Sequence, residues 1–85
     1  MARIIDGEKT NVIGANVKAI SKKQKMSQQA LSNKLELLGV YVCRGSVSRI
    51  EDGSRTVTDI EILAIAKVFD VSIGELFAGS EKVFD

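Results

Sequence analysis

Two helix-start patterns lie close together in the second half of this 85-residue chain. Thr58-Asp59-Ile60-Glu61 and Ser72-Ile73-Gly74-Glu75 both have the Ser/Thr-x-x-Glu form, in which the hydroxyl and the glutamate each accept from an otherwise free backbone amide of the first turn. The two patterns predict a helix from Thr58 to about Phe69 and a short helix through Leu76 and Phe77. No proline interrupts the chain, which favours a compact helical unit.

The first half carries two apolar stripes at helical spacing. Ile13, Val17 and Ile20 predict a helix over residues 11–24, capped by Thr10 or Asn11. A second helix is predicted over residues 28–38, with Ser27 as its N-cap and Gly39 at its end. Its buried face consists of three leucines, Leu31, Leu35 and Leu38.

A third helix is expected over residues 44–51, after an extended link at residues 40–42 and before Asp52-Gly53. Only Val47 and Ile50 are apolar, and Gly45, Ser48 and Arg49 lie opposite them. Glycine costs about 1 kcal/mol against alanine in a helix, and isolated helices shorter than about 12–15 residues are marginal in water. Tertiary packing must therefore hold this segment.

The exposed side of this third helix is low and polar. Small residues allow close approach to base edges, and an arginine can donate two hydrogen bonds to O6 and N7 of guanine. The pattern is therefore typical of a helix that enters the major groove of DNA. A surface helix that merely happens to be polar explains the segment, taken alone, equally well.

Charge is distributed unevenly along the chain, although the net charge is only +1. Residues 1–58 contain ten Lys or Arg against five acids, a net charge of +5, whereas residues 59–85 contain two against six, a net charge of −4. Such an imbalance can mark a surface that binds nucleic acid. A solvated basic helix produces the same imbalance, so charge alone does not decide.

Several classes of function are disfavoured by composition. The chain has no histidine and one cysteine, Cys43, which excludes an internal disulfide and makes a metal site or histidine-based catalysis very hard to build. We therefore expect no enzyme, no metal, no cofactor and no small-molecule substrate. There is no signal-peptide core and no apolar run long enough for a bilayer, which predicts a cytoplasmic protein without membrane contact.

The order of these elements resembles the lambda-repressor/Cro-like, or XRE-type, helix-turn-helix family. The matching segments are Ile13-Gly14, Met26-Ser27-Gln28-Gln29-Ala30-Leu31, Val47-Ser48-Arg49-Ile50-Glu51-Asp52-Gly53, Ala66-Lys67-Val68-Phe69-Asp70-Val71-Ser72 and Glu75-Leu76-Phe77. They cover about residues 12–77. The resemblance implies an all-α, compact five-helix bundle of bacterial or phage origin, with the helix-turn-helix at helices two and three. We divide the chain into an arm (1–10), a DNA-binding domain (11–77) and a tail (78–85).

The resemblance also implies roles for individual residues on double-stranded DNA. Phosphate contacts would fix the register of the protein, and base contacts would select the sequence. The base-reading positions are Arg44, Gly45, Ser46, Ser48 and Arg49. The positions expected to contact the backbone are Ser27, Gln28, Gln29, Ser54, Arg55, Thr56 and Lys22.

Three features depart from the family pattern. The connection from the second to the third helix is long, because residues 37–42 intervene. Ser21 occupies a position where the family often has an arginine that pairs with the glutamate matching Glu51, which leaves the partner of Glu51 open. Cys43 takes the place of a Ser or Thr cap, and we expect a buried or half-buried structural thiol rather than a redox switch.

The leading hypothesis is a sequence-specific transcriptional regulator, a repressor that occupies promoter DNA as a homodimer on an inverted-repeat operator. The alternative is a protein-interaction module on the same fold, as an antitoxin or anti-repressor would be; a nuclease is a distant third. Apolar residues near the C-terminus either form the dimer interface or complete the core of the monomer: Ile73, Leu76, Phe77, Val83 and Phe84.

Overall fold

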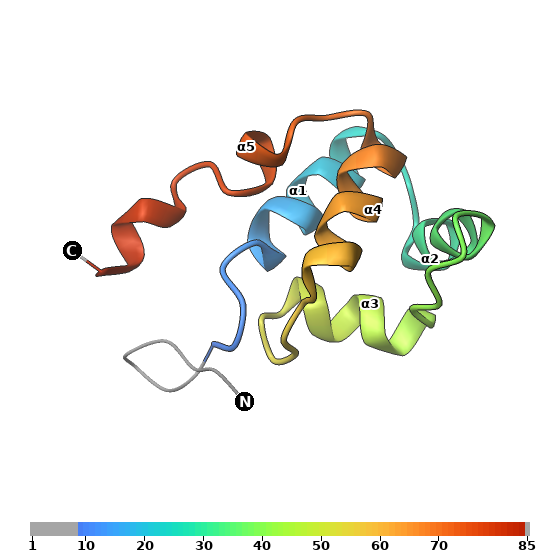
Figure 1. Cartoon of the computed structure of the whole chain (residues 1–85), viewed down its shortest axis with the longest axis horizontal. Coiled ribbons are helices and arrows are strands. Elements are labelled where there is room, and N and C mark those ends of the chain that lie inside the picture. The colour runs from blue at the N-terminus through green and yellow to red at the C-terminus, as the bar shows by residue number, and fades with distance from the viewer. Residues whose placement is uncertain (1–8, 85) are drawn as a thin grey trace.

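The computed structural model describes residues 9–84 of the chain. Within this range the chain forms five α-helices, one 3-10 helix and no strand, which confirms the predicted all-α five-helix bundle (Figure 1). The α-helices are α1 (Gly14–Lys23), α2 (Gln28–Leu37), α3 (Arg44–Glu51), α4 (Asp59–Phe69) and α5 (Ile73–Leu76), and the 3-10 helix is η1 (Ser80–Phe84). None of these helices is long and apolar enough to cross a bilayer.

The helices pack around one apolar core. α3 packs against α1 and α2, and α4 packs against α2 and α5. Figure 1 shows α2 at one end of the molecule and η1 at the opposite end, with α3 running along one side. The largest fully buried side chains come from every α-helix and the residue before α1: Phe69, Ile13, Leu31, Leu35, Ile50, Ile65, Leu76, Val17 and Val47.

Both predicted capping boxes are present. The hydroxyl of Thr58 accepts from the amide of Glu61 (3.1 Å), and Glu61 Oε1 accepts from the amide of Thr58 (3.0 Å). Ser72 and Glu75 make the same reciprocal pair at the start of α5. These pairs satisfy first-turn amides that the helices leave without a partner, so they fix where α4 and α5 begin.

Several helix boundaries differ from the prediction, and two of the differences have a clear cause. α1 begins at Gly14 instead of residue 11, because Asn11 Oδ1 accepts from the amides of Ile13 (3.1 Å) and Gly14 (2.8 Å) and so caps the helix from outside it. α2 ends at Leu37, and Gly39, at φ 81°, turns the chain away. Leu38 is consequently 46% exposed, and its predicted place on the buried face is wrong.

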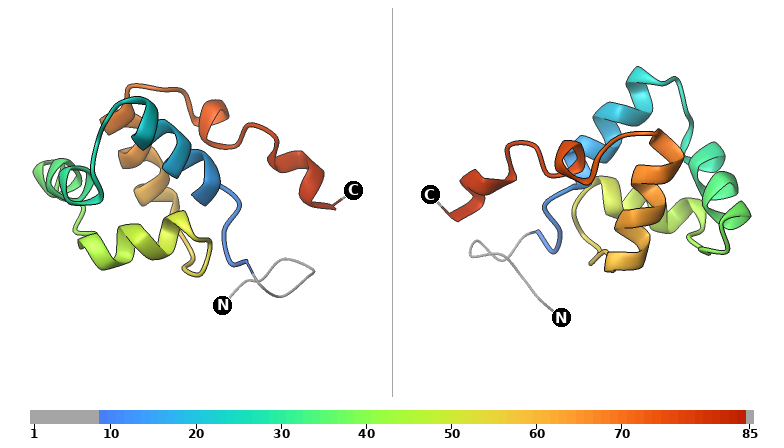
Figure 2. Two further views of the ribbon diagram at one scale, coloured as in Figure 1. Left: turned by 180° about the vertical axis from the view of Figure 1, so that it is seen from behind. Right: turned by 45° about the horizontal axis from the view of Figure 1, so that its top comes forward.

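The C-terminal segment packs against the start of α1. The side-chain amide of Asn16 donates to the carbonyls of Leu76 (2.8 Å) and Ala78 (2.9 Å). The Ser80 hydroxyl donates to the Val12 carbonyl (3.3 Å). The views in Figure 2 agree that η1 lies far from α2. The C-terminal segment therefore leaves the α2 end of the molecule uncovered.

Candidate nucleic-acid interface

α3 is held by contacts at its C-terminal end. The last carbonyls of a helix find no N–H donor within the helix, and here residues before α1 provide donors. Thr10 donates its amide to the Gly53 carbonyl (2.8 Å), and the Asn11 side chain donates to the carbonyls of Ile50 (3.1 Å) and Arg55 (2.8 Å). A weak helix former is thus kept helical by its surroundings, as the sequence predicted.

A close backbone approach fixes α3 against α1. A Cβ atom added to Gly14 would lie 2.1 Å from the Ile50 carbonyl oxygen, a distance that no side chain could occupy. Val47 and Ile50 are both 1% exposed and point into the core. The apolar side of α3 is therefore fully used for packing, and its polar side faces outward.

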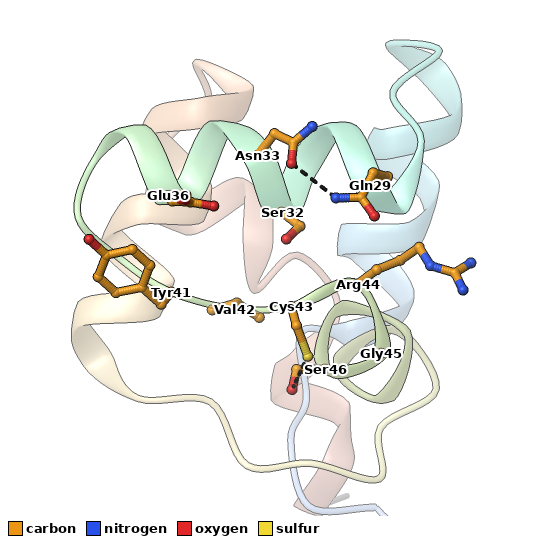
Figure 3. Close-up of a pocket in the computed structure, with 10 residues that line it drawn as sticks. All are labelled: Gln29, Ser32, Asn33, Glu36, Tyr41, Val42, Cys43, Arg44, Gly45 and Ser46. Atoms are coloured by element: carbon orange, nitrogen blue, oxygen red, sulfur yellow. Dashed lines mark hydrogen bonds between the residues drawn. The ribbon is translucent and has the colours of Figure 1, made fainter.

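No segment within residues 9–84 covers the polar side of α3. Arg44, Gly45 and Arg49 are exposed, whereas Ser46 and Ser48 are half-buried. Figure 3 shows the Tyr41 ring and the Arg44 side chain pointing to opposite sides, and Tyr41 is itself 78% exposed. Neither the Tyr41 link nor the C-terminal segment covers this surface, so its five predicted base-reading residues lie together on one accessible helix.

The N-terminus of α2 lies next to the C-terminal end of α3. Ser27 Oγ accepts from the Ala30 amide (3.0 Å), as predicted for an N-cap. No described residue accepts from the amides of Gln28 and Gln29, at a helix end that favours anions. Gln29 Nε2 donates to Asn33 Oδ1 (2.9 Å), and Lys22 is exposed in the last turn of α1. This end of the molecule has the donors that a DNA phosphate needs.

The partner of Glu51 is Gln28. Gln28 Nε2 donates to Glu51 Oε1 over 3.0 Å, while the buried Ser21 hydroxyl has no hydrogen-bond partner among the described residues. The sequence had assigned Gln28 to phosphate contact only. The structure gives its side chain a task within the protein, which leaves one side-chain N–H and the backbone amide for the phosphate contact predicted for Gln28.

Arg55 is occupied by an ion pair. Its guanidinium donates to both carboxylate oxygens of Glu61 (2.9 and 2.8 Å) and to the Thr56 carbonyl (3.0 Å). The guanidinium holds the pKa of Glu61 below its usual value, and the carboxylate raises the pKa of Arg55. Arg55 thereby fastens the loop after α3 to the first turn of α4, a role that the sequence reading missed.

Ser54 completes that loop. Its amide and hydroxyl both donate to Asp52 Oδ1 (2.9 and 2.6 Å), and these hydrogen bonds lower the pKa of the Asp52 carboxyl. Ser54 is exposed and Thr56 is half-buried. The contacts of Ser54 and Thr56 with the DNA backbone stay predictions.

The thiol of Cys43 is exposed, so the expected burial is wrong. Val42 fills the core at 3% exposure, and the alternation of an extended segment then turns the next side chain outward. Cys43 is the N-cap residue of α3 without a side-chain capping bond, in line with the poor capping expected of a thiol. Its Sγ lies 3.4 Å from Ser46 Oγ, and hydrogen bonding to Ser46 lowers the thiol pKa.

The long α2–α3 connection creates a groove. It lies between the outer face of α2 and residues 41–46, and Figure 3 shows Ser32, Asn33 and Glu36 along one wall. Within residues 9–84 no cluster of His, Cys, Asp or Glu is placed to hold a metal ion. Most of the residues that line the groove are polar, and the groove adjoins the start of α3, which makes it part of the same surface.

Comparison with known protein families decides the fold family. The model of a family described as "Helix-turn-helix" matches residues 17–76. The chain belongs to this helix-turn-helix family. The matched range contains α2, α3 and the whole candidate interface, and the resemblance to lambda-repressor/Cro-like regulators is confirmed.

Solved helix-turn-helix structures superpose on most of the domain. The restriction-modification controller protein C.AhdI from Aeromonas hydrophila is 28% identical, with a TM-score of 0.67 over 76% of this chain and 87% of that chain. The P22 c2 repressor, crystallised with a synthetic operator, is 27% identical, with a TM-score of 0.64 over 79% and 94%. The DNA-binding domain of BldD is 26% identical, with a TM-score of 0.65 over 81% and 93%. No curated protein matches the chain.

Proposed function

We propose that this helix-turn-helix protein is a sequence-specific DNA-binding transcription regulator. The observation that carries the proposal is the bare polar side of α3, with two exposed arginines beside an exposed glycine. Arg44 and Arg49 would read bases in the major groove, while the α2 N-terminus would contact phosphate. The similarity to the P22 c2 repressor, whose structure includes an operator, supports the same mode of binding.

The regulator would act as a repressor that occupies promoter DNA in the cytoplasm. One short helix reads only a few base pairs, so useful specificity requires two half-sites about 34 Å apart on one face of the DNA. A homodimer on an inverted repeat meets that requirement. We therefore propose a symmetric dimer as the binding form.

The exposed apolar residues of α4 are a candidate for the dimer contact. Ile60 is 65% exposed and Leu63 is 61% exposed, and they lie three residues apart on one helix face. Among the C-terminal apolar residues, Leu76 is fully buried and belongs to the core, whereas Ile73 is 39% exposed. Leu63→Glu should convert a dimer to a monomer in light scattering without unfolding the protein.

A second candidate function rests on the α2 end of the molecule. Leu37 is 86% exposed and Tyr41 is 78% exposed, an arrangement more usual for a protein-binding surface than for a phosphate contact. An antitoxin or anti-repressor would use such a surface.

Selection of bound sequences from a random double-stranded DNA pool, followed by gel shifts at rising salt, separates these functions. The proposed regulator yields a symmetric motif, and its affinity falls steeply with salt because counterions are released from the phosphates. If no DNA is retained even at low salt, the interaction module is the better assignment.

A further inference from the structure

Ser46 lies at the centre of a short hydrogen-bond chain on the exposed side of α3. Arg49 Nη2 donates to Ser46 Oγ over 3.1 Å, and the Cys43 thiol donates to the same oxygen over 3.4 Å. Both lone pairs of the hydroxyl are thus used, and its own hydrogen makes no bond to another described residue. Figure 3 shows the bond between Cys43 and Ser46 as a dashed line.

The guanidinium of Arg49 also lies back over Gly45. A Cβ atom added to Gly45 would be 3.8 Å from Arg49 Nη1, so the side chain runs toward the N-terminus of α3, as long helical side chains do. Gly45 and Ser46 together form a small platform beneath the guanidinium. An exposed arginine without such a platform would sample many rotamers, and ordering it on binding would cost affinity.

The hydrogen bond to Ser46 leaves Arg49 able to read a base. A guanidinium has five N–H donors in a fixed fork. A bidentate contact with guanine uses two of them, and the bond to Ser46 uses one. The Ser46 contact and a guanine contact are therefore compatible in one geometry.

We infer that Ser46 is a positioning residue, which holds the Arg49 guanidinium ready for one base pair and does not read that base pair itself. The inference rests on the proposed function and changes the base-reading role that the sequence suggested for Ser46. Cys43 supports Ser46 by fixing the orientation of its hydroxyl. The base preference of α3 then depends on a hydroxyl group that never touches the base.

The test uses the full chain and the site selected by the wild-type protein. Affinities for that site and for each of its single-base-pair substitutions are measured for the wild type, Ser46→Ala, Ser46→Thr, Arg49→Ala and the double variant Ser46→Ala/Arg49→Ala. Ser80→Ala is the matched control, because it removes a hydroxyl that donates to the Val12 carbonyl and that lies outside the predicted DNA-binding residues. Circular dichroism confirms that every variant is folded.

Arg49→Ala should abolish discrimination at one base pair. Ser46→Ala should reduce discrimination at that same base pair by about fivefold, the change that corresponds to one ordinary hydrogen bond. Ser46→Thr keeps the hydroxyl and should therefore keep the wild-type discrimination at that base pair. In the double variant, Ser46→Ala should cause no loss beyond that of Arg49→Ala.

Three results would overturn the inference. Ser46→Ala could leave the base preference unchanged, could weaken all sequences equally, as a phosphate contact would, or could alter a different base pair, as a direct reader would. A wild-type protein that selects no sequence would instead overturn the proposed function, so the two failures are distinguishable.

Discussion

Gln28, the first residue of α2, donates its side-chain amide to the carboxylate of Glu51, the last residue of α3, over 3.0 Å. Both residues are half-buried. This bond connects the N-terminal end of α2 to the C-terminal end of α3. Because the serine at position 21 carries no charge, the bond from the neutral Gln28 amide replaces the charged partner that the family pattern would provide.

Gln28→Ala should therefore destabilise the fold and loosen α3. Removing a hydrogen bond to a charged group costs roughly 1.5–3 kcal/mol, and the remaining carboxylate is left without its donor. Urea denaturation gives the free energy of unfolding for Gln28→Ala, Glu51→Ala and the double variant. A coupling energy near zero in this double-mutant cycle would show that the bond contributes nothing.

Gly14→Ala should be among the most damaging small substitutions in the chain. The added methyl would meet the Ile50 carbonyl oxygen at 2.1 Å, so α1 and α3 must separate, at a cost of about 1–3 kcal/mol or more. Gly45→Ala is the matched control, since its Cβ meets only Arg49 Nη1 at 3.8 Å and alanine is the better helix former by about 1 kcal/mol. Thermal melts should show opposite shifts, and equal shifts would contradict the close approach.

Local patterns predicted the elements, and long-range contacts explain where prediction failed. The capping boxes at Thr58 and Ser72 are formed by residues three apart, so the sequence alone locates the helix starts. The pairing of Gln28 with Glu51 joins residues 23 apart, and that of Asn11 with Arg55 joins residues 44 apart. Such partners depend on how the helices pack, which no spacing rule specifies.

The predicted site residues divide in the same way. Periodicity placed Gly45, Ser48 and Arg49 opposite the buried side of α3 correctly, because two apolar residues one turn apart define that side. The family resemblance placed Arg55 on the DNA backbone, and that contact stays a prediction; the ion pair with Glu61, six residues later, was not predicted. The capping box was the available hint, since its glutamate is a buried charge that requires a partner.

The Arg55–Glu61 pair predicts a dependence of stability on pH. The pKa of Glu61 is lowered in the folded protein, chiefly by hydrogen bonds from Arg55. Its contribution is therefore fully present above the pKa of the unfolded glutamate and is lost as pH falls through the lower, folded value. The difference in unfolding free energy between wild type and Glu61→Gln should be constant near neutral pH and shrink in acid.

Arg55→Ala tests the same pair from the other side. It should cost about 1.5–3 kcal/mol at neutral pH, because the largely buried Glu61 loses its bidentate donor. Arg55→Lys is the control, since lysine keeps the charge without the fork that binds both oxygens. The difference in unfolding free energy between Glu61 and Glu61→Gln could still shrink in acid when both proteins carry Arg55→Ala. That result would show that the backbone amide of Thr58, not Arg55, lowers the pKa of Glu61.

The exposed thiol of Cys43 reports on the geometry at the start of α3. Its pKa is lowered first by the hydroxyl of Ser46, whose own hydrogen can donate to the ionised sulfur, then by backbone amides, and least by the charge of Arg49. The rate of alkylation by iodoacetamide follows the thiolate fraction, so its midpoint in the free protein should fall below that of an ordinary cysteine. Ser46→Ala should raise the midpoint toward the ordinary value without reaching it, because the amides of Gly45 and Ser46 remain. Arg49→Ala should raise it less, and the reverse order would mean that charge rather than the Ser46 hydroxyl controls the thiol.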